Sequence, residues 1–262
     1  IGCAVNTALA TLLKNEDLYY NYTFLFVPES IGSIAFLSHN EHLIPKIKYS
    51  IFVEMVGLDN PLVLQKSYNG NELINHYALC AMAELQGVSK SYPYLTVAGN
   101  DEKIFNAPGV NIPSISITRV NQEAKLKKVE AVPPEEPKEL FLPYPEYHSH
   151  LDNIDKVDFK RVNETIDVLF NLCQIIEKDF LPVREFKGPA FLSKYGLWVD
   201  WRKNLKMSES IQWLMFCLEG DMTAFQIAER LELDFNEVVE LLDRFHDSGL
   251  IQKKRIPIEF DR

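Results

Sequence analysis

The stretch PLVLQKSYNGNELINHYALCAMAELQG, residues 61–87, joins a strand pattern to a helix pattern. Its first part, PLVLQKSY, is short and mostly apolar, as expected of a buried strand. The second part places Leu73, Tyr77 and Met82 on one side of a helix. Gly87 is the residue type that most often ends helices in the left-handed conformation. A strand followed closely by a helix is the repeating unit of a layered α/β sheet.

The same alternation extends to both sides of this stretch. An apolar helix pattern covers residues 3–14, and YYNYTFLFVP (19–28) reads as a buried strand leading into a helix at ESIGSIAFLSHN. KYSIFVEMVGL (48–58) and PSISITRV (113–120) predict two further strands. We therefore predict an α/β fold, with a mostly parallel or mixed sheet flanked by helices.

The chain is expected to contain two domains. The first covers 1–195 and includes a charged, proline-bearing flap at about 121–143, for which a solvated loop without a role is the alternative. A proline- and glycine-bearing link leads to a second domain at 205–262. Three helix patterns followed by GLIQKKRIPI predict a winged-helix arrangement there.

The charge of this second domain argues against nucleic-acid binding. The whole chain has a formal net charge of −10, and the outward positions of its last helix include Glu237, Glu240, Asp243 and Asp247. Such a helix would be repelled by phosphates. We expect a packing or protein-interaction module that supports a homo-oligomer or binds a protein partner.

Composition sets further limits. The 262 residues are 47% hydrophobic, as in ordinary globular proteins, and contain no run of 18 apolar residues and no signal-peptide pattern. We therefore expect no membrane association. The four cysteines are far apart in apolar, helix-like contexts, which indicates reduced core thiols and a cytoplasmic protein.

Three polar residues lie where α/β sheets place their ligands. Glu29 stands at a strand-to-helix junction, Asp101 in a loop before a strand, and His148 in PEYHSHLDN (145–153), before a helix. Loops at the carboxyl ends of strands form the ligand sites of such sheets. A Glu, an Asp and a His make a plausible ligand set for zinc or another borderline metal.

The motifs VPESIGSIAFLS, NDEKIFNAPGVNIPSISITR and PEYHSHLDN, in this order, resemble the aminopeptidase-like proteins found near bacterial polysaccharide-biosynthesis genes. These proteins are part of the superfamily of co-catalytic zinc aminopeptidases and glutaminyl cyclases. The resemblance implies a zinc-exopeptidase-like fold and makes Asp101 and His148 metal ligands. It matches Glu29 to one member of a Glu pair, as a metal ligand or as the catalytic general base.

Two departures from that pattern matter. The family's Glu pair is represented by Glu29 alone, and the family's first His and bridging Asp precede a helix with which this sequence begins. Two-metal hydrolysis uses both ions to hold the nucleophile and the carbonyl oxygen. We therefore expect the chain as given to be inactive as a peptidase and suspect that upstream residues are missing.

Four other residues are candidates for contacts with substrate or ligands. Tyr147, His150 and Asp152 flank His148, and Asp152 is expected to orient the loop or to cap the next element of the chain. Arg119 ends a strand and pairs either with a substrate carboxylate or with a structural partner.

The leading hypothesis is a zinc metallo-aminopeptidase that hydrolyses peptide-like or aminoacyl amides of small substrates. The alternative is a non-catalytic binding or assembly protein that uses the same fold and the winged-helix tail.

Overall fold

The computed structural model describes residues 1–87, 89–97, 99–123 and 142–260, so most of the predicted flap lies outside the described residues. These residues divide into two compact units, Ile1–Ile175 and Ile176–Phe260. The second unit begins before the link that the sequence suggested, because a strand at Leu181–Arg184 pairs with the strand at Ile251–Lys254.

The first unit is built on a four-stranded mixed sheet, which confirms the predicted fold class at that level. Its strands are β1 (Ser50–Val53), β2 (Val63–Gln65), β3 (Lys90–Tyr92) and β4 (Ser114–Thr118), in the order β1-β4-β2-β3. β4 runs parallel to β1 and antiparallel to β2, and β2 runs parallel to β3. β4 is buried along its whole length.

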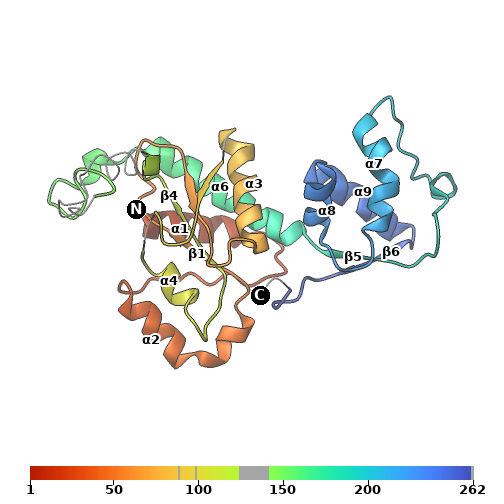
Figure 1. Cartoon of the computed structure of the whole chain (residues 1–262). Coiled ribbons are helices and arrows are strands. Elements are labelled where there is room, and N and C mark those ends of the chain that lie inside the picture. Colours follow the sequence, from red (N-terminus) through yellow and green to blue (C-terminus); the bar gives the residue numbers. More distant parts are fainter. Residues whose placement is uncertain (88, 98, 124–141, 261–262) are drawn as a thin grey trace, which may run out of the picture. The chain divides into compact units, whose positions relative to one another are not determined.

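Helices surround this sheet. In the first unit they are α1 (Gly2–Leu13), α2 (Ile31–His39), η1 (Glu41–Lys46), α3 (Leu73–Gln86), α4 (Glu102–Phe105), η2 (Ile154–Lys156) and α6 (Phe159–Lys178). α2 and α4 lie next to each other (Figure 1), because Leu37 and Phe105 pack together with Ile112 in one apolar cluster. α3 ends as predicted at Gly87, which has a φ of 71°.

The strand predicted at residues 19–28 does not form. No strand is assigned to this segment, which runs irregularly into α2. Aromatic and β-branched side chains favour a strand only when a neighbouring strand offers backbone partners. The composition of this segment could not show that none of the described strands pairs with it.

The second unit contains three α-helices and a two-stranded antiparallel ribbon. Its elements are β5 (Leu181–Arg184), η3 (Leu192–Tyr195), α7 (Leu205–Phe216), α8 (Ala224–Leu231), α9 (Phe235–Asp247) and β6 (Ile251–Lys254). Thr223 and Gln226 form a capping box at the start of α8, and the Asp234 side chain caps α9. The winged-helix assignment stays a prediction.

Within the part of the chain that is described, no helix is both long and apolar enough to span a membrane. All four cysteines are free thiols. Cys173 and Cys217 are buried as predicted, Cys80 is half-buried, and Cys3 is exposed. The prediction of a core position was wrong for Cys3, because the side of α1 that packs inward carries Val5, Leu9 and Leu13.

Candidate functional site

One face of the buried strand β4 is polar. The sequence Ser-Ile-Ser-Ile-Thr alternates, so Ser114, Ser116 and Thr118 share one face of the strand, and all three are fully buried. Gln65 of β2 is the cross-strand partner of Ser116 and adds to the same face. Buried polar groups require hydrogen-bond partners, so this face must be covered by other polar residues.

Glu102 supplies the first of these partners. The Gln65 Nε2 donates to Glu102 Oε1 at 3.0 Å, and the Asn100 backbone N–H donates to the same carboxylate at 2.9 Å. The Gln65 amide is itself oriented by the Val97 N–H, which donates to Gln65 Oε1 at 2.8 Å. Burial raises the pKa of Glu102, although these hydrogen bonds act in the opposite direction.

Glu54 is the second acidic residue on this face. It directly follows β1, and its carboxylate accepts hydrogen bonds from the Ser116 hydroxyl at 3.3 Å and from Asn100 Nδ2 at 3.4 Å. Burial, and then the charge of Glu102, raise the pKa of Glu54 to about 7, with a smaller contribution from Glu29. A buried carboxyl with a pKa near neutrality, close to other carboxylates, is a common feature of functional sites.

Asp101 connects the loop before α4 to the start of α2. Its Oδ1 accepts a 2.6 Å hydrogen bond from the backbone N–H of Ser30, and the residue is 8% exposed. Ser30 has a φ of 60°, an unusual conformation for a residue other than glycine, so this bond helps to hold a strained turn. The exposed Glu29 precedes Ser30, so the predicted residues Glu29 and Asp101 lie at one corner of the site.

The loop that contains His148 reaches the same region through Tyr147. Burial raises the pKa of the Tyr147 phenol, and the charges of Glu54 and Glu29 raise it further. The His148 ring stacks on Tyr147 with centroids 3.9 Å apart and an angle of 16° between the planes. His148 has a φ of 58° and is exposed to solvent.

Asp152 holds this loop. It accepts a 2.7 Å hydrogen bond from the Tyr144 hydroxyl, and burial together with this bond raises the pKa of Tyr144. A 2.8 Å ion pair between Glu146 and Lys156 closes the loop on its other side. His150 is exposed. The loop-orienting role of Asp152 stays a prediction, and the bond from Tyr144 supports it.

Arg119 lies inside the first unit, where its side chain is fully buried. Its guanidinium donates to the carbonyl oxygens of Asn60 at 2.6 Å and Arg161 at 2.9 Å, and to Thr165 Oγ1 at 3.2 Å. It also pairs with Glu164 at 3.4 Å. Burial lowers the pKa of Arg119 to about 10. These contacts favour a structural role for Arg119 over pairing with a substrate carboxylate.

The sequence did not single out Glu54, Glu102 or Gln65 as site residues. The available signal was the alternation in residues 114–118 and a carboxylate directly after an apolar strand. Within the described ranges, no group of three His, Cys, Asp or Glu side chains lies close enough together to hold a metal ion.

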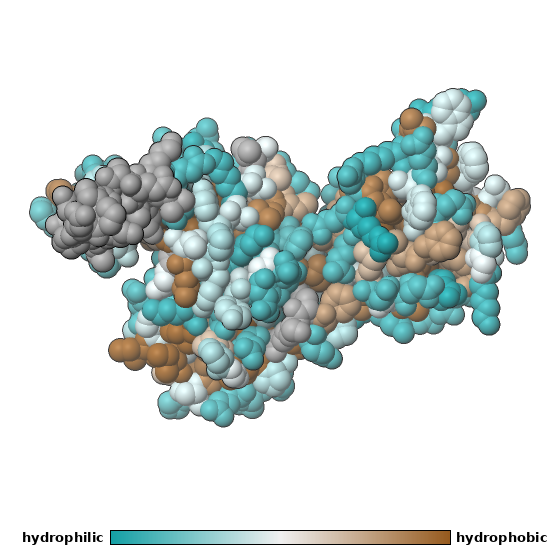
Figure 2. Space-filling model, viewed as in Figure 1, coloured by the Kyte–Doolittle hydropathy of each residue, from teal (hydrophilic) through white to brown (hydrophobic). Residues whose placement is uncertain are grey.

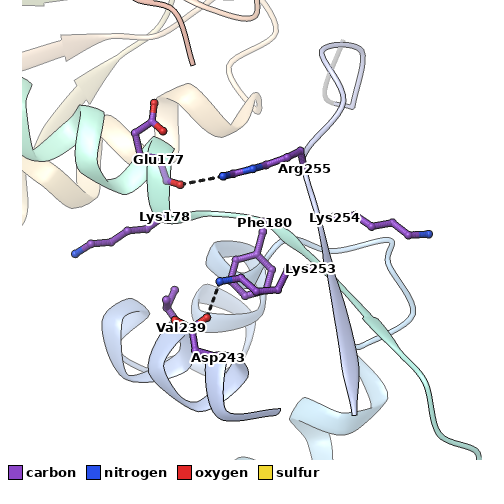
Figure 3. A pocket seen from close by; sticks show the side chains of 8 residues that line it. All are labelled: Glu177, Lys178, Phe180, Val239, Asp243, Lys253, Lys254 and Arg255. Carbon is purple, nitrogen blue, oxygen red and sulfur yellow. Dashed lines mark hydrogen bonds and ion pairs between the residues drawn. The ribbon is translucent and has the colours of Figure 1, made fainter. Parts of the chain in front are cut away.

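The second unit has a groove of a different kind, with a volume of about 300 Å³. Figure 3 shows that it is lined by side chains from the end of α6, from Phe180, from α9 and from β6 with the residue after it. Lys253 lies over the Phe180 ring at 4.2 Å and pairs with Asp243 at 2.7 Å, and Lys178 donates to Asn236 at 3.1 Å. The Asp243 carboxylate offsets the charge of Lys253.

Sequence comparison relates part of this chain to known proteins. Residues 1–127 match the family model described as "Domain of unknown function (DUF4910)". Over 121 residues, the chain is 32% identical to a Clostridium acetobutylicum protein named "Putative polysaccharide biosynthesis protein with aminopeptidase-like domain". That alignment covers 45% of this chain and 27% of the relative.

A solved structure extends the similarity to nearly the whole chain. It is the crystal structure of a "putative peptidase" from Clostridium acetobutylicum, with a TM-score of 0.75 and 21% identity. The match covers 95% of this chain and 52% of that one. The mixed α/β fold of this chain is therefore similar to that of this solved structure, and the chain spans about half the length of the solved relative.

Proposed function

We propose that this chain forms part of a zinc-dependent, aminopeptidase-like hydrolase that cleaves peptide or aminoacyl amide bonds of small substrates. What supports it most is that Glu29, Glu54 and Tyr147, from three distant segments, lie near enough for the charges of Glu29 and Glu54 to raise the pKa of Tyr147. The charge of Glu29 also adds to the raised pKa of Glu54. The Ser30–Asp101 hydrogen bond adds a fourth segment.

The donors fit zinc in kind. Carboxylate oxygen from Glu29 and Asp101 and imidazole nitrogen from His148 are ordinary zinc ligands. In number they fall short, since the described residues form no three-ligand group. We therefore propose that a complete site needs donors beyond these three and that the chain alone does not hydrolyse amides. Bound zinc would polarise the substrate carbonyl and activate water.

Two residues have defined tasks under this proposal. Asp101 holds the turn that presents Glu29, which acts as a ligand or as the general base. Tyr147 positions the His148 ring by stacking, with the loop fixed by the Tyr144–Asp152 bond. Cytoplasmic localisation is proposed from the sequence alone.

Zinc titration by calorimetry tests the metal site. We expect zinc binding to the complete gene product to weaken at least tenfold in His148→Ala and Asp101→Ala, and to stay unchanged in His150→Ala, which alters an exposed ring two residues away. Release of the amine from aminoacyl anilides, measured on the complete gene product, should be lost in the same two variants. Equal zinc affinity in His148→Ala and His150→Ala would remove His148 from the site.

The alternative is a non-catalytic binding or assembly protein. It is favoured by one observation, the exposed aromatic side chains around α7 in the second unit. Under this alternative, the complete gene product neither binds zinc nor hydrolyses amides, but self-associates or binds a protein.

A further inference from the structure

An unusual set of apolar side chains is exposed on and just before α7. Trp198, Trp201, Leu205, Trp213 and Phe216 are 65%, 53%, 54%, 66% and 76% exposed, respectively. Trp213 and Phe216 also contact each other, with ring centroids 6.3 Å apart. We call these five residues the aromatic surface. Figure 2 shows hydrophobic residues, in brown, among hydrophilic ones on the visible face of this unit.

The aromatic surface does not belong to the core of the second unit. The inward side of α7 carries Met207, Ile211, Leu214 and Met215, which are all buried. The outward side of α7 thus carries the apolar side chains of Leu205, Trp213 and Phe216, with exposed polar residues between them.

The exposed area is large enough for a specific interface. A large aromatic side chain has an area of about 150–250 Å². At the observed exposures, the aromatic surface presents roughly 700 Å², close to the roughly 800 Å² per partner of a standard interface. Isolated exposed apolar residues need no explanation, but a set of this size within one segment indicates a binding surface.

We propose that the aromatic surface is the contact between two copies of this chain, which pair α7 against α7 in antiparallel orientation about a two-fold axis. The outward ridge of α7, formed by Leu205, Glu209, Gln212 and Phe216, is self-complementary in this arrangement. With the axis between Ser210 and Ile211, Leu205 meets the partner's Phe216, and Glu209 meets the partner's Gln212. The symmetry then repeats both contacts.

The charges favour this register. Glu209 and Gln212 are both exposed and lie between the apolar ends of the ridge. In the antiparallel register, the Gln212 amide donates to the partner's Glu209 carboxylate. In a parallel register, two Glu209 carboxylates would face each other, which is unfavourable. A second copy is therefore the occupant that this ridge fits.

The tryptophans provide a direct measurement. The chain has three, Trp198, Trp201 and Trp213, and all lie in the aromatic surface. Tryptophan emission therefore reports whether this surface is covered. We expect the mass measured by light scattering to approach twice 30.2 kDa as protein concentration rises, with a parallel blue shift of the emission.

Substitutions test the register. Phe216→Ser should weaken the dimer at least tenfold, whereas Leu85→Ser, which alters a 52% exposed side chain on α3, should leave it unchanged. Gln212→Glu places two carboxylates together and should also weaken it. Adding Glu209→Lys to Gln212→Glu should restore association, and melting temperatures control for effects within the helix.

Three outcomes would overturn the proposal. One is a monomer with red-shifted emission at every concentration. Another is a dimer that persists in Phe216→Ser. The third is an emission that is blue-shifted but independent of concentration, which would assign the aromatic surface to another segment of the protein.

Discussion

The backbone N–H of Ser30 donates a 2.6 Å hydrogen bond to Asp101 Oδ1, and this contact joins the turns that precede α2 and α4. The two residues are 71 positions apart in the sequence, and their contact brings Glu29 to the acidic face of the sheet. The effect of these acidic residues on the free energy of unfolding can be measured without knowing the substrate.

Removing the Asp101 carboxylate should destabilise the first unit. A hydrogen bond to a charged group contributes about 1.5–3 kcal/mol, so Asp101→Ala should lower the free energy of unfolding by about 2 kcal/mol. Asp101→Asn keeps an oxygen acceptor and should lose about half as much. Urea unfolding and amide exchange at Ser30 check this. Unchanged exchange at Ser30 in Asp101→Ala would contradict it.

The free energy of unfolding should fall as pH rises through the range in which Glu54 loses its proton. The pKa of Glu54 is about 7 in the folded state and 4.5 in the reference state, so the folded protein binds this proton more tightly. The resulting stabilisation is complete below pH 4.5 and is lost as pH rises towards 7 and above. The shift corresponds to at most about 3 kcal/mol.

The Glu54→Gln variant isolates this contribution. Urea unfolding between pH 4 and 9, with a chelator present so that metal does not compete with protons, should show a smaller pH dependence in the variant. Part of the slope should remain, because burial also raises the pKa of Glu102. Parallel curves for the two proteins would show that Glu54 does not titrate in this range.

Gln65→Glu should produce a pH-dependent loss of stability. The change keeps the acceptor for the Val97 N–H but replaces the donor to Glu102 with a second carboxylate. We expect a loss of about 3 kcal/mol at pH 8, which falls near pH 5, where one carboxyl is protonated and can donate. Gln65→Met is the matched control: it removes the donor to Glu102 without adding a carboxylate, so its loss should vary less with pH than that of Gln65→Glu. Unfolding midpoints at both pH values decide between them.

Arg119→Ala should cost more than any exposed ion-pair variant. It leaves the carbonyl oxygens of Asn60 and Arg161 without their buried donor, and we expect a loss of about 3–5 kcal/mol. Asp59→Ala removes a 2.9 Å pair with Arg161 in which the Asp59 side chain is 72% exposed, and it should cost below about 1 kcal/mol. Similar unfolding midpoints for the two variants would contradict the structural role of Arg119.

Most elements of the first unit could be predicted from local patterns. The periodicity of α3 and its final glycine, and the alternation in β4, are determined by residues within each segment. The strand expected at 19–28 failed, because strand formation depends on partners elsewhere in the chain. β3 was not predicted, since three residues of mixed polarity give no detectable period.

The candidate site was predicted only in part. Glu29, Asp101 and His148 were selected from loop positions and from the family resemblance, and the structure brings Glu29 and Asp101 to one corner. Gln65 and Glu102 were overlooked because Gln65 lies in a strand of 3 residues and Glu102 in a helix of 4 residues. The sequence of such a short element does not show which of its faces is buried. The cross-strand register shows that Gln65 shares a face with Ser116, and the hydrogen bond from Gln65 places Glu102 over that face.

The pairing of β5 with β6 affects how the second unit can be studied in isolation. A recombinant fragment that starts after residue 195 lacks Leu181–Arg184 and leaves β6 without its only hydrogen-bonded neighbour among the described strands. An unpaired strand edge is a template for intermolecular pairing and promotes aggregation. A soluble fragment of this unit should therefore begin upstream of Leu181.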